Sequence, residues 1–191
     1  MERELLITGI GGQGVQLSAQ VLARAATREG RGVMYLGIYG GMMRGGNTEA
    51  TVVIADGPIE APPTVGDTWS AILMHHDFSE STIARLRAGS LVLVNSTVFE
   101  GSFNRDPYTV IDVPATDIAV ELGNIMTASM VMLGAYCAIT DVVGLPSLDG
   151  AVEASLPSYR TQHVARNIEA IRAGFDAVPR ALVPAWSEVA A

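Results

Sequence analysis

Residues 4–15 read ELLITGIGGQGV, an apolar run that leads directly into a glycine-rich turn. A helix-compatible stretch follows, from residue 15 to about residue 29. Strand, glycine turn and helix N-terminus in this order form an anion-binding element, because the first N–H groups of a helix lack intrahelical partners and the helix dipole is positive there. Gly9, Gly11 and Gly14 fit the G-x-G-x-x-G spacing of dinucleotide-binding folds. The stretch therefore predicts the first strand and helix of a Rossmann-like domain.

Other parts of the known nucleotide-binding signatures are missing. Dinucleotide folds usually place Asp or Glu about 20 residues beyond the turn. The second strand is expected at residues 33–36, and no carboxylate stands at its end. A nucleoside-triphosphate loop would need Lys and a hydroxyl residue after Gly14, where Val15 and Gln16 stand. Because all twelve basic residues are Arg, the chain also has no lysine nucleophile or Schiff base.

Length and composition favour one α/β domain. A chain of 191 residues is long enough for one core and too short for two full-sized domains. The net charge of −8 argues against a nucleic-acid partner. The single cysteine, Cys137, excludes a disulfide framework and any cluster held by several cysteines of this chain. Arg3 and Glu4 lead straight into a strand, and the longest apolar run, residues 125–139, is shorter than the roughly 20 residues of a spanning helix. We therefore expect a cytoplasmic protein without a cleavable signal and without membrane contact.

Apolar periodicity predicts strands that alternate with helices. Further strands are expected at residues 47–55, 69–74, 91–94 and 110–113, and helices at residues 79–88, 119–122, 125–139 and around 164–175. The 125–139 helix is apolar on nearly every face, so it should lie in the core or against a partner. This order predicts a single α/β domain with an open, mostly parallel sheet flanked by helices.

A second glycine cluster follows the second predicted strand, where residues 39–46 read YGGMMRGG. In an open parallel sheet this loop lies at the carboxyl edge, beside the first glycine turn. Arg44 stands between two glycine pairs, where little side-chain bulk prevents a bidentate approach to an anion. The predicted ligand site comprises Gly9, Gly11, Gly12, Gln13, Gly14, Arg44, Gly45 and Gly46.

With these two glycine motifs the chain resembles the gamma subunit, or the equivalent domain, of 2-oxoacid:acceptor oxidoreductases. That family includes the pyruvate:ferredoxin, 2-oxoisovalerate and indolepyruvate enzymes. Later matches are VPAT at residues 113–116, LGN at 122–124, LG at 133–134 and Asn167, so the resemblance covers most of the chain. The chain departs from the family at Ser129, where Asn is frequent, and at Met43, where a polar residue is common.

The resemblance implies a subunit of a thiamine diphosphate enzyme that oxidatively decarboxylates a 2-oxoacid and forms an acyl-coenzyme A. Electrons would leave through iron–sulfur clusters to ferredoxin or, in relatives, to NAD. The thiamine diphosphate, magnesium and clusters would be held by alpha- and beta-type chains and a ferredoxin-like or other electron-transfer chain. This chain agrees, because it has one Cys and no Gly-Asp-Gly motif leading to a magnesium-binding Asn. On its own it should therefore be inactive and hold no cofactor.

The implied role of this chain is to complete the assembly and to shape the channel through which coenzyme A reaches the active centre. The eight predicted site residues would then contact coenzyme A, and no catalytic residue is expected in the chain. Residues 1–177 would form the gamma-type domain, and residues 178–191 a tail that docks on a partner subunit, with Trp186 as its anchor.

Other interpretations stay open. The chain could instead be a free-standing nucleotide-binding oxidoreductase domain, or a purely structural assembly subunit. The first glycine turn could serve tight strand–helix packing without a ligand, and Arg44 could pair with an acid of this or another chain. His75, His76 and Asp77 are not expected to bind a metal, because neighbouring residues of a strand point to opposite faces and the chain has only one further His.

Overall fold

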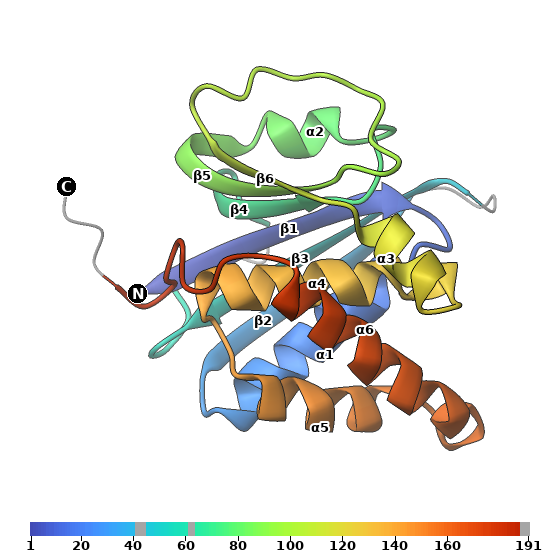
Figure 1. Cartoon of the computed structure of the whole chain (residues 1–191). Helices are drawn as coiled ribbons and strands as arrows, with labels where there is room; N and C mark the ends of the chain where they lie inside the picture. The colour runs from blue at the N-terminus through green and yellow to red at the C-terminus, as the bar shows by residue number, and fades with distance from the viewer. Residues whose placement is uncertain (41–44, 61–63, 188–191) are drawn as a thin grey trace.

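A six-stranded β-sheet forms the centre of the structure, a computed structural model that describes residues 1–40, 45–60 and 64–187 (Figure 1). The strands are β1 (Glu2–Ile10), β2 (Gly32–Tyr39), β3 (Asn47–Ala55), β4 (Thr68–Leu73), β5 (Leu86–Asn95) and β6 (Thr109–Val113). Their order in the sheet is β2-β3-β1-β4-β5-β6. β1, β4, β5 and β6 pair in parallel, and β3 is antiparallel to both of its neighbours. The predicted α/β architecture with a mostly parallel sheet is confirmed.

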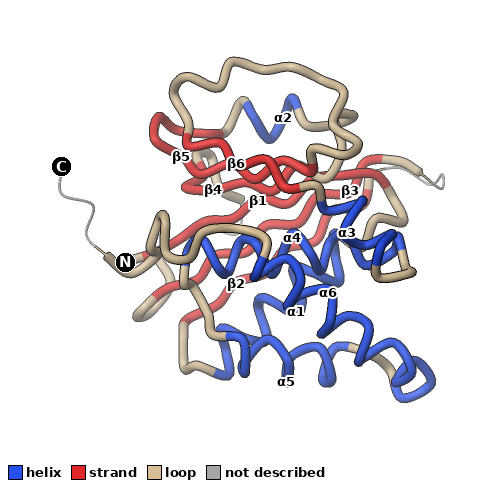
Figure 2. The backbone as a smooth tube through the Cα atoms, in the orientation of Figure 1, coloured by secondary structure: helices blue, strands red, loops and turns tan. Residues whose placement is uncertain are grey.

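Helices cover one face of the sheet, and mainly irregular segments cover the other (Figure 2). The helices are α1 (Val15–Arg28), α2 (Glu80–Ile83), α3 (Ala115–Glu121), α4 (Ala128–Thr140), α5 (Leu145–Ser155) and α6 (Val164–Asp176), with 3-10 turns η1 (Ile125–Thr127) and η2 (Ser158–His163). In β1, Leu5 and Ile7 join the helix-side core, whereas Leu6 faces the opposite cluster with Val53 and Val65. This alternation follows from the two-residue period of a strand.

The apolar helix predicted at residues 125–139 lies in the core. All residues of α4 are buried within the chain, whereas Ile125 and Met126 in η1, ahead of α4, are exposed. Of the two alternatives for this helix, the core position is confirmed, and its apolar character requires no partner.

One predicted helix was wrong in its extent, and one helix was not predicted. The helix expected at residues 79–88 ends at Ile83, because Leu86 already pairs with Thr68 in the sheet and Gly89 has a φ of 82°. Helix α5 was not expected. Leu148, Ala151 and Val152 have helical spacing, but they are the only buried residues of this helix, which packs against α1.

The described part of the predicted tail, residues 178–187, lies against its own domain. The N–H groups of Ala181, Val183 and Ala185 donate to the carbonyls of Ala138, Ile139 and Thr140. These are the last carbonyls of α4, which have no partner inside the helix. The Trp186 indole donates to the carbonyl of Val142 at 3.2 Å, and the Arg31 guanidinium lies 4.0 Å from the Trp186 ring. Trp186 is thus anchored to this chain, and docking of the tail on a partner stays a prediction.

Across the part of the chain that the structure describes, no helix is long and apolar enough to cross a membrane.

Candidate functional site

The first glycine turn joins β1 to α1 and needs glycine for two different reasons. Gly12 and Gly14 have φ values of 103° and 82°, in the left-handed region that side chains rarely adopt. A Cβ atom on Gly14 would also lie 2.5 Å from Ser129 Oγ of α4. The chain can therefore enter α1 at this angle, close against α4, only with glycine at position 14.

The second glycine cluster lies directly beside this turn. The Gly11 N–H donates to the Gly46 carbonyl at 2.8 Å, and a Cβ on Gly11 would lie 3.3 Å from the Gly45 nitrogen. Proximity of the two clusters was predicted and is confirmed for Gly45 and Gly46. The connection differs from the expected one, because residues 39–46 link the antiparallel strands β2 and β3. Arg44 lies outside the described residues.

A cavity of about 680 Å³ opens beside these two clusters. Gly11, Gly12 and Gly14 border it from the first turn, and Gly45 and Gly46 from the second. The lining also includes Asn124, Met126, Thr127, His163 and Asn167. The volume falls within the range of about 300–1,000 Å³ that is typical of small-molecule sites.

The first residues of α1 contribute to the lining of the cavity. The residue that precedes the helix, Gly14, offers no side-chain cap, and Val15, Gln16 and Leu17 line the cavity. These first-turn amides have no acceptor within the helix. None of the described residues that border the cavity is Asp or Glu. An anion would therefore meet the positive end of α1 without a lining carboxylate to oppose it.

Two amide side chains that line the cavity, Gln16 and Asn47, differ in whether their oxygen atoms are free to accept a hydrogen bond from a ligand. Gln16 is engaged, since its Nε2 donates to the Glu49 carbonyl at 2.8 Å and its Oε1 accepts from the Tyr35 hydroxyl at 2.6 Å. Asn47 Oδ1 is buried and has no hydrogen-bond partner in the described structure. A buried amide oxygen without a partner is costly, so Asn47 is suited to accept from a ligand.

Two of the predicted site residues do not border this cavity. A Cβ on Gly9 would lie 2.5 Å from Gln13 Oε1 and 2.8 Å from Met74 Cβ, so this glycine permits close packing. Gln13 braces the turn: its Oε1 accepts from the Ile10 N–H at 2.9 Å, and its side chain borders a separate cavity of about 310 Å³. Sequence reasoning did not assign Asn47, Met126 or His163 to the site, because no local pattern connects segments so far apart in the chain.

The prediction that residues 75–77 bind no metal assumed that they belong to a strand, and this assumption was wrong. β4 ends at Leu73, so His75, His76 and Asp77 lie in the turn beyond the strand and need not point to opposite faces. The two imidazole rings stack with centroids 4.3 Å apart.

The buried cysteine is not available to a cofactor. Cys137 lies within α4 and is almost fully buried, and burial raises the pKa of its thiol far above the ordinary value. The chain has no other cysteine, so an iron–sulfur cluster does not fit this subunit's own residues.

Comparison with known proteins identifies the family. The family model of pyruvate ferredoxin/flavodoxin oxidoreductase matches residues 4–177. The 2-oxoglutarate synthase subunit KorC of Methanothermobacter marburgensis is 32% identical over 181 residues, which cover 91% of this chain and 95% of that protein. The pyruvate synthase subunit PorC of Methanothermobacter thermautotrophicus is 25% identical over 179 residues, which cover 93% of this chain and 96% of that protein.

Solved structures agree with this assignment. The gamma subunit of a keto/oxoacid ferredoxin oxidoreductase from Geobacter sulfurreducens superposes with a TM-score of 0.79 at 26% identity, covering 93% of this chain and 96% of that one. The 2-oxoglutarate:ferredoxin oxidoreductase from Magnetococcus marinus, solved with 2-oxoglutarate, coenzyme A and succinyl-CoA bound, has the same fold at 18% identity. Its TM-score is 0.81, over 94% of this chain and 32% of that longer chain. The KorC, PorC and Geobacter sulfurreducens relatives are named as subunits of larger enzymes, which argues against a free-standing oxidoreductase domain. The chain therefore belongs to the pyruvate ferredoxin/flavodoxin oxidoreductase family, as a gamma-type subunit of a 2-oxoacid:ferredoxin oxidoreductase.

Proposed function

We propose that this subunit completes the coenzyme A site of its complex, and that the cavity beside the two glycine clusters receives part of the coenzyme. The observation that carries the proposal is the convergence of the uncapped N-terminus of α1 with residues 45–46 on one cavity of about 680 Å³. Helix N-terminal amides bind phosphate groups in many folds. The Magnetococcus marinus relative, which has the same fold, binds coenzyme A and succinyl-CoA.

The complex would then transfer the acyl group of a 2-oxoacid to the coenzyme A thiol. The carboxylate leaves as carbon dioxide, and two electrons pass to ferredoxin or another acceptor. Thiamine diphosphate with magnesium and the iron–sulfur clusters would belong to the other subunits, of alpha, beta and ferredoxin-like type. The residues of this chain would bind and orient the coenzyme. The amides of α1 and Arg44 would hold phosphate, and Asn47 Oδ1 would accept from an N–H group of the coenzyme.

Arg44→Ala tests the charged part of this site. A charge-assisted hydrogen bond contributes roughly 1.5–3 kcal/mol, so the variant complex should have an apparent coenzyme A constant raised about 10- to 100-fold. The constant for the 2-oxoacid should change little, because the chemistry lies on another chain. Arg180→Ala is the matched control, since Arg180 is exposed and pairs with Asp176 in the helix-terminal region of α6.

Asn47→Ala tests the neutral part of the site. Removal of a buried oxygen that has no partner should not lower the free energy of unfolding, but it should raise the coenzyme A constant about 2- to 10-fold. Steady-state kinetics of the assembled variants, with gel filtration of each, gives the answer. Intact complexes with unchanged coenzyme A constants would reject the proposal in favour of a purely structural subunit. A complex that dissociates only with Arg44→Ala would place Arg44 in a subunit contact.

A further inference from the structure

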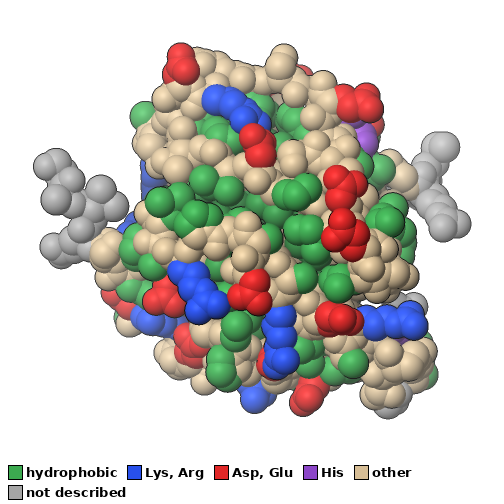
Figure 3. All heavy atoms as spheres, viewed as in Figure 1, with side chains coloured by type: hydrophobic (Ala, Val, Ile, Leu, Met, Phe, Trp, Pro, Cys, Tyr) green, Lys and Arg blue, Asp and Glu red, His purple; other side chains and the backbone are tan. Residues whose placement is uncertain are grey.

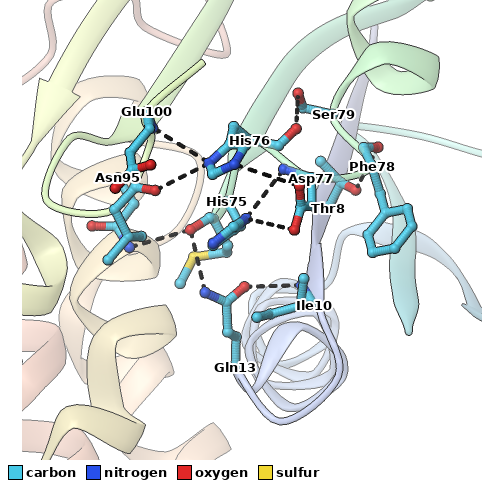
Figure 4. A network of polar contacts seen from close by, with 12 residues as sticks. Thr8, Ile10, Gln13, His75, His76, Asp77, Phe78, Ser79, Asn95 and Glu100 are labelled. Carbon is cyan, nitrogen blue, oxygen red and sulfur yellow. Dashed lines mark hydrogen bonds and ion pairs between the residues drawn. The ribbon is translucent and has the colours of Figure 1, made fainter. Parts of the chain in front are cut away.

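Three metal-ligating side chains meet at the carboxyl end of β4, outside the cavity described above. His75, His76 and Asp77 each offer one ligand atom, and these atoms lie within 4.8 Å of one another. His75 Nδ1 is 3.6 Å from Asp77 Oδ2, and His76 Nε2 is 3.4 Å from Asp77 Oδ1. Figure 4 shows both rings directed toward the same carboxylate.

The turn that carries these side chains is held by its own hydrogen bonds. The His76 carbonyl accepts from the Ser79 N–H at 3.2 Å and from Ser79 Oγ at 2.7 Å. Thr8 Oγ1 donates to the Phe78 carbonyl at 3.4 Å, which ties the turn to β1. Phe78 has a φ of 64°, a strained conformation for a residue with a side chain. The three side chains are therefore brought together by the backbone before any ion binds.

The hydrogen bonds of the two rings determine which nitrogen of each ring could bind an ion. His75 Nδ1 accepts a hydrogen bond from the Asp77 N–H at 3.1 Å, so its lone pair is engaged in the absence of an ion. His76 Nδ1 lies 3.4 Å from the Val98 carbonyl. When Nδ1 donates there, Nε2 is unprotonated and faces Asp77 Oδ1, which is the arrangement found for metal-binding histidines. In the other tautomer Nδ1 accepts from the Glu100 N–H at 3.4 Å and Nε2 donates to Asp77, an arrangement that needs no cation.

We propose that His75, His76 and Asp77 bind one divalent transition-metal ion of the zinc type. Bonds of 2.0–2.1 Å in a tetrahedron place ligand atoms about 3.3–3.4 Å apart, whereas one ligand atom from each of the three residues lies within 4.8 Å of the others here. Binding would therefore draw the side chains together by about 1.5 Å at most. Two imidazoles with one carboxylate suit zinc, cobalt or nickel, which accept mixed nitrogen and oxygen ligands. Coordination through His75 Nδ1 replaces the hydrogen bond from the Asp77 amide. Three protein ligands leave the fourth coordination position to a water molecule. Solvent can reach this position because the Asp77 side chain is 57% exposed.

Titration of the full-length, tag-free chain with Co²⁺ and then Zn²⁺ tests this site. One saturable site per chain is expected, with the visible absorption of four-coordinate Co²⁺ and its loss when Zn²⁺ displaces the cobalt. His76→Ala and Asp77→Asn should each weaken binding by about tenfold or more. His163→Ala is the matched control, because His163 is the only other histidine, and it should bind like the wild type.

Circular dichroism of each variant confirms that the chain is folded. Asp77→Asn preserves the side-chain volume and the backbone amide, so this variant should fold. Its metal affinity therefore tests the site even if His76→Ala does not fold. The proposal is overturned by a folded wild-type chain without saturable binding, by an Asp77→Asn chain that binds like the wild type, or by loss of binding in His163→Ala. None of these results depends on coenzyme A, so the site is tested separately from the function proposed above.

Discussion

At the scale of single residues, Gly14 shows how a ligand site and the core restrict the same position. Its φ of 82° directs the chain into α1, and Ser129 Oγ occupies the space that a side chain would take. Gly14→Ala should therefore lower the free energy of unfolding by about 1–3 kcal/mol. Gly66→Ala is the control, since Gly66 has open space and no positive φ, and its change should stay within about 0.5 kcal/mol.

A double variant separates the two causes. Ser129 Oγ is buried without a hydrogen-bond partner, so Ser129→Ala alone should be nearly neutral. In the Ser129→Ala background the overlap disappears and only the backbone strain of Gly14→Ala remains. Urea denaturation of the four proteins gives both contributions, and an unchanged Gly14→Ala midpoint would show that the turn relaxes at no cost.

At the scale of the elements, α4 and α6 cross at two glycines that allow backbone contact. A Cβ on Gly134 of α4 would overlap the Ile171 carbonyl of α6, and a Cβ on Gly174 of α6 would overlap the Val131 carbonyl of α4. Because each obstacle is a backbone atom, the helices would have to separate. Gly134→Ala and Gly174→Ala should each cost about 2–4 kcal/mol in the free energy of unfolding.

The matched control for this crossing is another helical glycine. A Cβ on Gly150 of α5 would meet only the end of the Arg28 side chain, which can move. Gly150→Ala should thus be neutral or stabilise the chain by up to about 1 kcal/mol, as helix propensity predicts. Thermal unfolding compares the three variants, and equal midpoints for Gly134→Ala and Gly150→Ala would contradict the close crossing.

Cys137 makes the burial of α4 measurable. As the only thiol of the chain, buried and with a raised pKa, it should not react with a disulfide reagent while the protein is folded. Urea should make it reactive at the midpoint of unfolding that circular dichroism reports. A labelling rate that rises between pH 7 and pH 9 in the native protein, as for an exposed thiol, would show that α4 opens locally.

At the scale of the whole molecule, exposed apolar residues lie next to the glycine turn. Ile125 and Met126 of η1 are 57% and 60% exposed, and Met126 borders both cavities. On the face shown in Figure 3, apolar side chains form patches between acidic and basic ones. Since the chain is a subunit of a larger enzyme, we expect η1 to contact a partner subunit.

Ile125→Glu should therefore reduce assembly of the complex without unfolding the chain. Leu182→Glu tests the predicted docking of the tail in the same way, because Leu182 is similarly exposed at 50% and lies in the segment that packs against the other end of α4. Co-purification with the other subunits and sedimentation of the product measure the effect. Recovery of the complex with Ile125→Glu equal to that of the wild type would remove η1 from the interface.

Local patterns in the sequence were sufficient to predict the strands, α1, α4 and α6, because alternation, helical spacing and glycine turns depend on residues close in the chain. They were also sufficient to suggest the family, since its motifs are short and contiguous. The same reasoning overextended the helix after residue 79, where pairing of Leu86 in the sheet overrides local preference.

Only the tertiary structure decided where distant segments meet. It inserted β3 between β1 and β2, so that Gly46 reaches Gly11, and it brought Asn47, Met126 and His163 to one cavity. It also ended β4 at Leu73 and so allowed His75, His76 and Asp77 to converge. These arrangements depend on strand pairing and on packing between segments that are far apart in the chain. Apolar periodicity reflects only residues close in the chain, so it cannot predict which distant segments pack together.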